Sequence, residues 1–251
     1  KVPGVFNKDY TYPTETDLDY YKSKGFQLIR LPFLWERLQP VLGSELDAKE
    51  IERYTAVIDA ASKRGILVLP DMHNYCRRKV NAEWVLIGTA AVPVEAVADA
   101  WGRLALAFKD KSNIWGYGIM NEPHDMPAKD SWFTIAQSII NKIRTVDAKT
   151  AIVVGGDSWS SAERWLAYSG NLKNLKDPSN NLIFEAHIYF DENSSGAYKY
   201  AYEKELTTPE TGIVRALPFV EWLKTNKLQG FVGEYGVPDS DPGWLLTLDK
   251  L

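Results

Sequence analysis

The chain has 251 residues, 45% hydrophobic and 25% charged, a composition typical of a folded globular protein that excludes disordered, collagen-like and coiled-coil chains. Its 29 Lys and Arg against 33 Asp and Glu leave a net charge of −4, so no nucleic acid is expected as a partner. No apolar run approaches the ~20 residues that cross a bilayer, so no membrane partner is expected either, and the single cysteine excludes an intrachain disulfide.

Six short apolar segments are rich in β-branched or aromatic residues and bounded by Gly, Asn or Asp, which is typical of buried strands. In chain order they cover residues 27–33, 66–73, 114–123, 151–157, 182–191 and 231–236. Residues 1–13 before the first of them are expected to form a loop. The basic run 77–79 and Trp84 are expected in a long loop after the second.

Amphipathic helical patterns lie between these strands. The clearest covers residues 47–64, where Asp47 with Glu50 supplies an N-terminal cap and Gly65 ends the pattern. Further helices are expected over residues 16–24, 94–108, 131–146, 161–169 and 212–226, with the start of another at 244–251.

Alternating strands and helices predict a parallel sheet, because each return to the sheet needs a helical crossover. No linker or repeat divides the chain, so we expect one α/β domain over residues 1–251. Six strands do not decide between an open sheet and a barrel. Neither G-x-G-x-x-G nor G-x-x-x-x-G-K-[ST] follows a strand, so nucleotide binding has no support.

Polar side chains gather where the predicted strands end, and in a parallel barrel these ends share the face that carries active sites. The residues are Arg30, His73, Asn74, Asn121, Glu122, His187, Tyr189, Glu234 and Tyr235. Glu122 and Glu234 are the most informative pair, because a carboxylate that ends an apolar strand is costly to bury without a partner. Two such acids on one face suit glycoside hydrolysis, and structural ion pairs at the rim are the alternative.

Other chemistries lack their usual patterns. Metal-ligand residue types are present, but His-x-His and H-E-x-x-H are absent, and one cysteine cannot form a thiolate cluster. No predicted strand ends in a lysine suited to a Schiff base, and G-x-S-x-G is missing. We therefore expect neither a metal nor another cofactor.

The polar residues at the predicted strand ends, with the sequence around them, resemble glycoside hydrolase family 5, most closely its endo-β-1,4-glucanases (cellulases). The matching segments, in family order, are 29–33 (IRLPF) with 35–37 (WER), 71–75 (DMHNY), 121–124 (NEPH), 187–189 (HIY) and 233–236 (GEYG). The resemblance implies a (β/α)8 TIM barrel and a retaining double displacement. It makes Glu122 the general acid/base and Glu234 the nucleophile.

The resemblance also implies roles for supporting residues. Arg30 holds Glu234 ionised, Asn121 contacts the sugar 2-hydroxyl, His73 binds the same sugar, His187 lies beside Glu122 and Tyr189 lies beside Glu234. The mechanism needs a protonated Glu122 and an ionised Glu234. We expect this asymmetry to come from Arg30 beside Glu234 and from the lack of a cation beside Glu122.

Aromatic residues after the strand ends are expected to line a glucan cleft. Trp35, Tyr75 and Trp159 are the predicted stacking platforms, and Asn74 is expected to contact substrate beside them. The tryptophans in helical patterns are expected to pack in the core instead; these are Trp101, Trp132, Trp165 and Trp222.

The family's first and last strands have no counterpart here, so we expect a barrel truncated at both ends, with two exposed edges that favour self-association. The leading interpretation is a secreted, retaining endo-β-1,4-glucanase of cellulose-type β-glucans, since polymers do not enter cells. Another β-glycan, such as mannan, mixed-linkage glucan or xyloglucan, is one alternative. A non-catalytic carbohydrate-binding remnant is the other.

Overall fold

The computed structural model describes residues 1–239 and 241–251. Its centre is one sheet of six parallel strands in the order β1-β2-β5-β6-β7-β8. The strands are β1 (Leu28–Phe33), β2 (Leu67–Met72), β5 (Gly116–Gly118), β6 (Ala151–Gly155), β7 (Leu182–Ile188) and β8 (Gln229–Tyr235). All six predicted strands are therefore confirmed, and their sequential order is the order of a (β/α) barrel.

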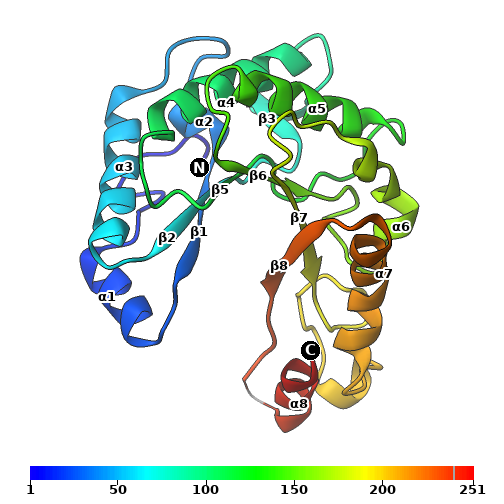
Figure 1. Cartoon of the computed structure of the whole chain (residues 1–251). Coiled ribbons are helices and arrows are strands. Elements are labelled where there is room, and N and C mark those ends of the chain that lie inside the picture. Colours follow the sequence, from blue (N-terminus) through cyan, green and yellow to red (C-terminus); the bar gives the residue numbers. More distant parts are fainter. Residues whose placement is uncertain (240) are drawn as a thin grey trace.

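Helices lie outside the curved sheet, and the whole chain forms an arch that is open between β1 and β8 (Figure 1). The longer helices are α1 (Glu15–Ser23), α3 (Ala48–Lys63), α4 (Val94–Phe108), α5 (Ser131–Arg144), α7 (Thr211–Asn226) and α8 (Pro242–Lys250). Short helical turns are α2 (Trp35–Leu38), α6 (Trp165–Tyr168), η1 (Gly170–Asn174) and η2 (Tyr202–Lys204). In the part of the chain that the structure describes, no helix is both long and apolar enough to span a membrane.

The residues expected to begin and end the helix over 47–64 do so in α3. The Asp47 side chain accepts a hydrogen bond from the backbone N–H of Glu50 and caps α3. Gly65, with a φ of 66°, follows the helix in the left-handed region that glycine adopts without strain. The apolar face of α3 then packs against the outside of the sheet.

Two segments differ from the sequence expectation. The expected loop after β2 contains a hairpin of β3 (Arg77–Val80) and β4 (Glu83–Leu86). Its turn is made by Asn81 and Ala82, both with positive φ, so the usual Asn-Gly signal of such a turn is absent from the sequence. The segment 114–123 is a regular strand only at Gly116–Gly118.

The core lies mainly between the helices and the sheet. Trp101, Trp132, Trp165 and Trp222 are all buried there, as predicted. The indole N–H groups of Trp101 and Trp132 donate to backbone carbonyls of the strand ends, at 2.9 and 2.8 Å, which ties α4 and α5 to the sheet.

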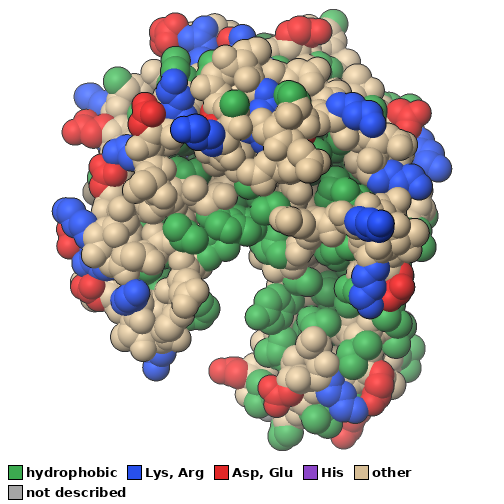
Figure 2. Space-filling model, viewed as in Figure 1, with side chains coloured by type: hydrophobic (Ala, Val, Ile, Leu, Met, Phe, Trp, Pro, Cys, Tyr) green, Lys and Arg blue, Asp and Glu red, His purple; other side chains and the backbone are tan. Residues whose placement is uncertain are grey.

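The concave side of the sheet carries a second, smaller apolar cluster of Leu69, Ala151, Val153 and Ile183. Figure 2 shows apolar side chains lining the notch between the two arms of the arch. Within residues 1–239 and 241–251, no strand pairs with the outer edge of β1 or β8. Self-association through these edges stays a prediction.

Candidate active site

Glu122 and Glu234 lie together at the carboxyl ends of the strands. Glu122 follows β5, and Glu234 lies near the end of β8. One oxygen of each lies within 4.8 Å of the other and of a nitrogen of His187. This spacing is close to the roughly 5–5.5 Å between the carboxyl groups of retaining glycosidases. Glu122 has a φ of 43°, and such strain in a non-glycine residue is concentrated at functional sites.

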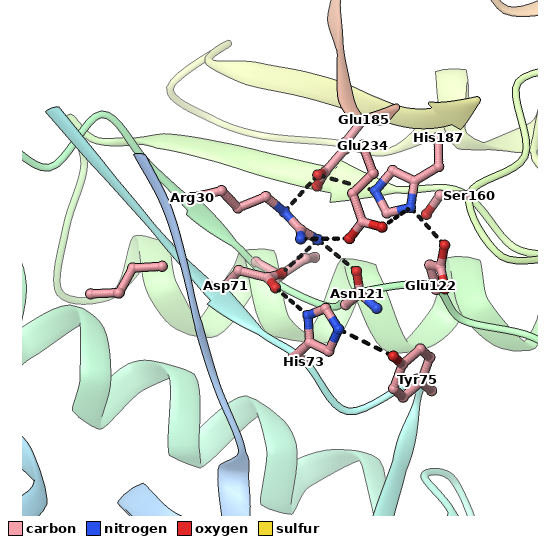
Figure 3. Close-up of polar contacts among 12 residues, drawn as sticks. Arg30, Asp71, His73, Tyr75, Asn121, Glu122, Ser160, Glu185, His187 and Glu234 are labelled. Atoms are coloured by element: carbon pink, nitrogen blue, oxygen red, sulfur yellow. Dashed lines mark hydrogen bonds and ion pairs between the residues drawn. The ribbon is translucent and has the colours of Figure 1, made fainter. Parts of the chain in front are cut away.

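Glu234 is held at both oxygens, and Figure 3 shows its contacts with Arg30 and His187. Arg30, on β1, donates from Nη1 to Oε1 at 2.7 Å, and the Tyr189 hydroxyl donates to Oε2 at 2.9 Å. Burial acts to raise the pKa of Glu234, but the charges of His187 and Arg30 and the Tyr189 hydroxyl outweigh it, so the pKa is lowered. Glu234 therefore stays ionised near neutral pH.

Glu122 also has a charged neighbour, which corrects the expectation that no cation lies beside it. The Nδ1 of His187 lies 2.7 Å from Oε1 of Glu122. Burial acts to lower the pKa of His187, but its contacts with Glu122, Glu185 and Glu234 raise it to about 9. His187 is therefore a cation near neutrality. Glu234 differs from Glu122 in having two further donors, Arg30 and Tyr189.

Asn121 and His73 complete the polar floor of the site. Arg30 donates from Nη2 to the Asn121 Oδ1 at 2.6 Å, while the buried Asn121 Nδ2 has no partner among the described residues. His73 contacts Asp71 through Nδ1 at 2.9 Å and the Tyr75 hydroxyl through Nε2 at 3.1 Å. Asn121 thus keeps a free donor for a ligand hydroxyl, and His73 is fixed from both sides.

Two buried carboxylates of the site had no role in the sequence interpretation. Asp71 on β2 and Glu185 on β7 lie 3.2 and 2.9 Å from the Arg30 guanidinium. Burial raises the pKa of Asp71 in spite of Arg30 and His73. The available signal was an acidic residue inside each of the two predicted strands, since a buried strand seldom carries an unpaired charge.

A cavity of about 340 Å³ opens beside Glu122, and its lining includes Trp159, Arg164, His187 and Tyr189. The Trp159 side chain is 39% exposed and stacks on His124, with ring centroids 4.4 Å apart. Tyr75 is 36% exposed. Both side chains are therefore partly open to solvent at the strand ends, although His124 covers one face of Trp159.

Trp35 and Asn74 do not lie where the sequence analysis placed them. The prediction that they contact substrate is wrong for both. Trp35 is fully buried, under the Arg78 guanidinium, and its indole donates to Gln39 at 2.8 Å. Asn74 is also buried, and its Oδ1 accepts from the backbone N–H of Trp35 at 2.7 Å. The turn of α2 directs Trp35 into the core, where Asn74 caps the turn.

The site residues are also of types that bind metals. Carboxylates and imidazole are common ligands, and Glu122, His187 and Glu234 are close enough to share a cation. However, the neighbouring carboxylates raise the pKa of His187 to about 9, and a protonated imidazole has no free lone pair for a metal. The arrangement suits proton transfer between acids better than metal binding.

Comparison with known proteins agrees with the geometry. The chain matches the model of Cellulase (glycosyl hydrolase family 5) over residues 2–249. The probable endo-beta-1,4-glucanase B of Aspergillus kawachii is 33% identical over 243 residues, which are 96% of this chain and 68% of that protein.

Solved structures resemble the chain closely. The endoglucanase Cel5A of Pseudomonas stutzeri in complex with cellobiose gives a TM-score of 0.91 at 40% identity, over 99% of this chain and 73% of that one. XacCel5A in complex with cellopentaose gives 0.90 at 38% identity, over 100% of this chain and 78% of that one. These likenesses confirm the predicted α/β barrel fold, of which this chain forms six strands. The chain belongs to glycosyl hydrolase family 5, the cellulase family.

Proposed function

We propose that the chain is a retaining endo-β-1,4-glucanase in which Glu234 is the nucleophile and Glu122 the general acid/base. The observation that carries the proposal is the pair of carboxyl groups within 4.8 Å, one of them held ionised by Arg30 and Tyr189. A pair at this distance leaves no room for a water between acid and base, which favours direct attack.

The reaction then has two steps. In the first, a Glu234 oxygen forms a bond to the anomeric carbon, the glycosidic C–O bond breaks, and the Glu122 proton goes to the leaving oxygen. In the second, Glu122 takes a proton from a water whose oxygen attacks the same carbon, and the Glu234 ester bond breaks. Two inversions at the anomeric carbon give net retention.

The surroundings of the two acids support a proposal for which sugar lies on which side of the cleft. The cavity with Trp159 lies beside Glu122, so we place the leaving sugar there. Asn121 and His73 lie beside Arg30 on the other side, and the free Nδ2 of Asn121 is available to the 2-hydroxyl of the sugar that is attacked. In glycosidases, substrate distortion and hydrogen bonds at this hydroxyl that strengthen in the transition state together supply several kcal/mol.

The substrate class follows from relatives and from the aromatic residues. Solved relatives were obtained with cellobiose and cellopentaose, which supports a β-glucan ligand. Trp159 and Tyr75 offer flat faces to sugar rings. Since a polymeric glucan stays outside cells, we also propose that the protein acts as a secreted enzyme, and that it needs no cofactor.

The test is to incubate the chain with carboxymethyl-cellulose, mannan, mixed-linkage glucan and xyloglucan and to measure reducing ends. Glucanase activity on carboxymethyl-cellulose, lost in Glu122→Gln and Glu234→Gln but not in the exposed Glu221→Gln, supports the proposal. Cleavage of mannan or xyloglucan alone contradicts the cellulose-type substrate and makes that polysaccharide the substrate instead. Binding without new reducing ends favours the non-catalytic remnant and contradicts the activity.

A further inference from the structure

A buried carboxylate lies beneath the two proposed catalytic acids. Glu185, in the middle of β7, is 2% exposed. Its Oε1 lies 2.9 Å from Nε of Arg30 and 3.3 Å from Nε2 of His187, so one oxygen faces two cationic groups (Figure 3). The contact with Arg30 is an ion pair and not a hydrogen bond, since the N–H at Nε does not point at the carboxylate oxygen. Glu185 faces away from the cavity and touches no position where a sugar is proposed to bind.

The neighbouring strand leaves space for this oxygen. A Cβ at Gly233, on β8, would lie 1.9 Å from Oε1 of Glu185, which no side chain can tolerate. The backbone of Gly233 is not in the left-handed region, so conformational freedom does not explain the glycine here. The absence of a side chain at position 233 is what admits the Glu185 carboxylate next to Glu234.

We propose that Glu185 is a positioning residue, whose buried carboxylate holds the Arg30 guanidinium and the His187 ring in the orientations in which they contact Glu234 and Glu122. Its effect on turnover rests on the proposed glucanase function. Its effect on His187 does not.

The charges around Glu185 explain why one more anion is needed there. Arg30 comes from β1, Asp71 and His73 from β2 and its end, Glu122 from the end of β5, and Glu234 from β8. His187 lies on β7 itself, with Tyr189 after it. An imidazolium that is almost fully buried is costly unless it is paired. Glu122 binds only Nδ1 of His187, so Glu185 is the partner of the other nitrogen.

Loss of Glu185 therefore has a defined physical result. Without the anion at Nε2, burial favours the neutral imidazole, and the pKa of His187 falls. A neutral ring has one hydrogen to share between its two nitrogens, so the Nδ1 donor to Glu122 is no longer guaranteed. The geometry of both catalytic carboxylates then loosens although neither has been changed.

The experiment is an NMR titration of the three histidine rings in isotope-labelled protein, with His187→Asn used to assign the signal. In the unchanged chain we expect His187 to titrate near pH 9. Glu185→Gln, which has the same shape without the charge, should lower that pKa by about one unit or more. Glu205→Gln is the matched control, because Glu205 is also buried but accepts from the backbone of Glu192 and Tyr200.

Two results overturn the proposal: a folded Glu185→Gln chain whose His187 titrates as before, or an unchanged chain whose His187 titrates at its ordinary 6.5. If Glu185→Gln yields no folded protein, Gly233→Ala is titrated instead, because its methyl group displaces the carboxylate. The same fall in pKa supports the proposal, and an unchanged titration overturns it.

The second readout is turnover. Glu185→Gln should lower kcat about tenfold or more, the scale found when groups that orient metal ligands are removed. KM should change little, because Glu185 touches no substrate. A rise in KM with kcat unchanged contradicts the positioning role. A chain that shows no hydrolysis at all contradicts the proposed function but leaves the histidine titration decisive for Glu185.

Discussion

The Tyr189 hydroxyl donates to Oε2 of Glu234 at 2.9 Å, on the carboxylate oxygen that Arg30 leaves free. Tyr189 lies just after β7 and Glu234 on β8, so the bond joins neighbouring strands across the site. A donor to the ionised form stabilises that form and lowers the pKa of the acid. The hydroxyl therefore contributes to keeping Glu234 ready for attack.

Tyr189→Phe tests this contribution. Removing the hydroxyl raises the pKa of Glu234 towards its ordinary value of 4.5, so the acidic limb of kcat/KM moves to higher pH. The measurement is the rate on a soluble β-glucan from about pH 3 to 7. Tyr200→Phe is the control, because Tyr200 is exposed and its hydroxyl bonds to none of the described residues. An acidic limb that stays in place would show that Tyr189 does not act on Glu234.

Replacing the partly exposed Trp159 should affect substrate binding, whereas replacing the buried Trp35 should affect stability. Trp159→Ala should raise KM for β-glucan about fivefold, since an aromatic contact is worth about 1 kcal/mol. It should lower the unfolding free energy by only about 1 kcal/mol, through loss of the stack on His124. Trp35→Ala should lower the unfolding free energy by about 3–5 kcal/mol through lost core packing. Urea unfolding and steady-state kinetics on both variants check this. A specific rise in KM for a stably folded Trp35→Ala chain would contradict its structural role.

His187 also links stability to pH. Its folded pKa of about 9 exceeds its ordinary 6.5, so its contribution to stability is complete below about pH 6.5 and is lost as pH rises through 9. The expected loss is about 3 kcal/mol, because each unit of pKa difference corresponds to about 1.4 kcal/mol. Urea unfolding at the two ends of this range measures it, and His187→Asn should remove this part of the pH dependence. Equal pH dependence in the variant would assign the effect to other groups.

The sequence predicted the strands and the site for one reason. Short apolar segments alternate with amphipathic ones, and parallel strands bring their carboxyl ends to one face. Arg30, Glu122, His187 and Glu234 each lie near such an end, so their approach follows from topology without any knowledge of side-chain packing. The pairing of these residues is therefore the most predictable part of the structure.

The remaining details depend on packing that local patterns do not encode. Trp35 follows a strand end just as Trp159 does, but the turn of α2 buries the first and leaves the second exposed. The cation beside Glu122 was missed because a histidine is charged or neutral according to its neighbours. Glu185, two residues earlier on the same strand, is one of these neighbours.

An ion pair far from the catalytic acids gives a last prediction. Arg144, at the end of α5, contacts both oxygens of Asp177 at 2.6 and 2.9 Å, with both side chains almost fully buried. Asp177 also accepts from the backbone N–H groups of Ser179 and Asn181, and so shapes the connection into β7. Burial acts to raise the pKa of Asp177, but Arg144 and these backbone donors outweigh it and lower the pKa.

Asp177→Asn leaves the buried Arg144 charge without its partner, so we expect a loss of about 3–5 kcal/mol in the free energy of unfolding at neutral pH. Because the folded pKa of Asp177 lies below its ordinary 3.8, the unchanged chain keeps this stabilisation above that value and loses it as pH falls through the lowered one. The cost of Asp177→Asn should therefore shrink in acid, while the exposed Asp110→Asn changes little at either pH. Urea midpoints at pH 7 and about pH 3 make the comparison. A cost that is equal at both pH values would mean that the pair contributes shape rather than charge to the β6–β7 connection.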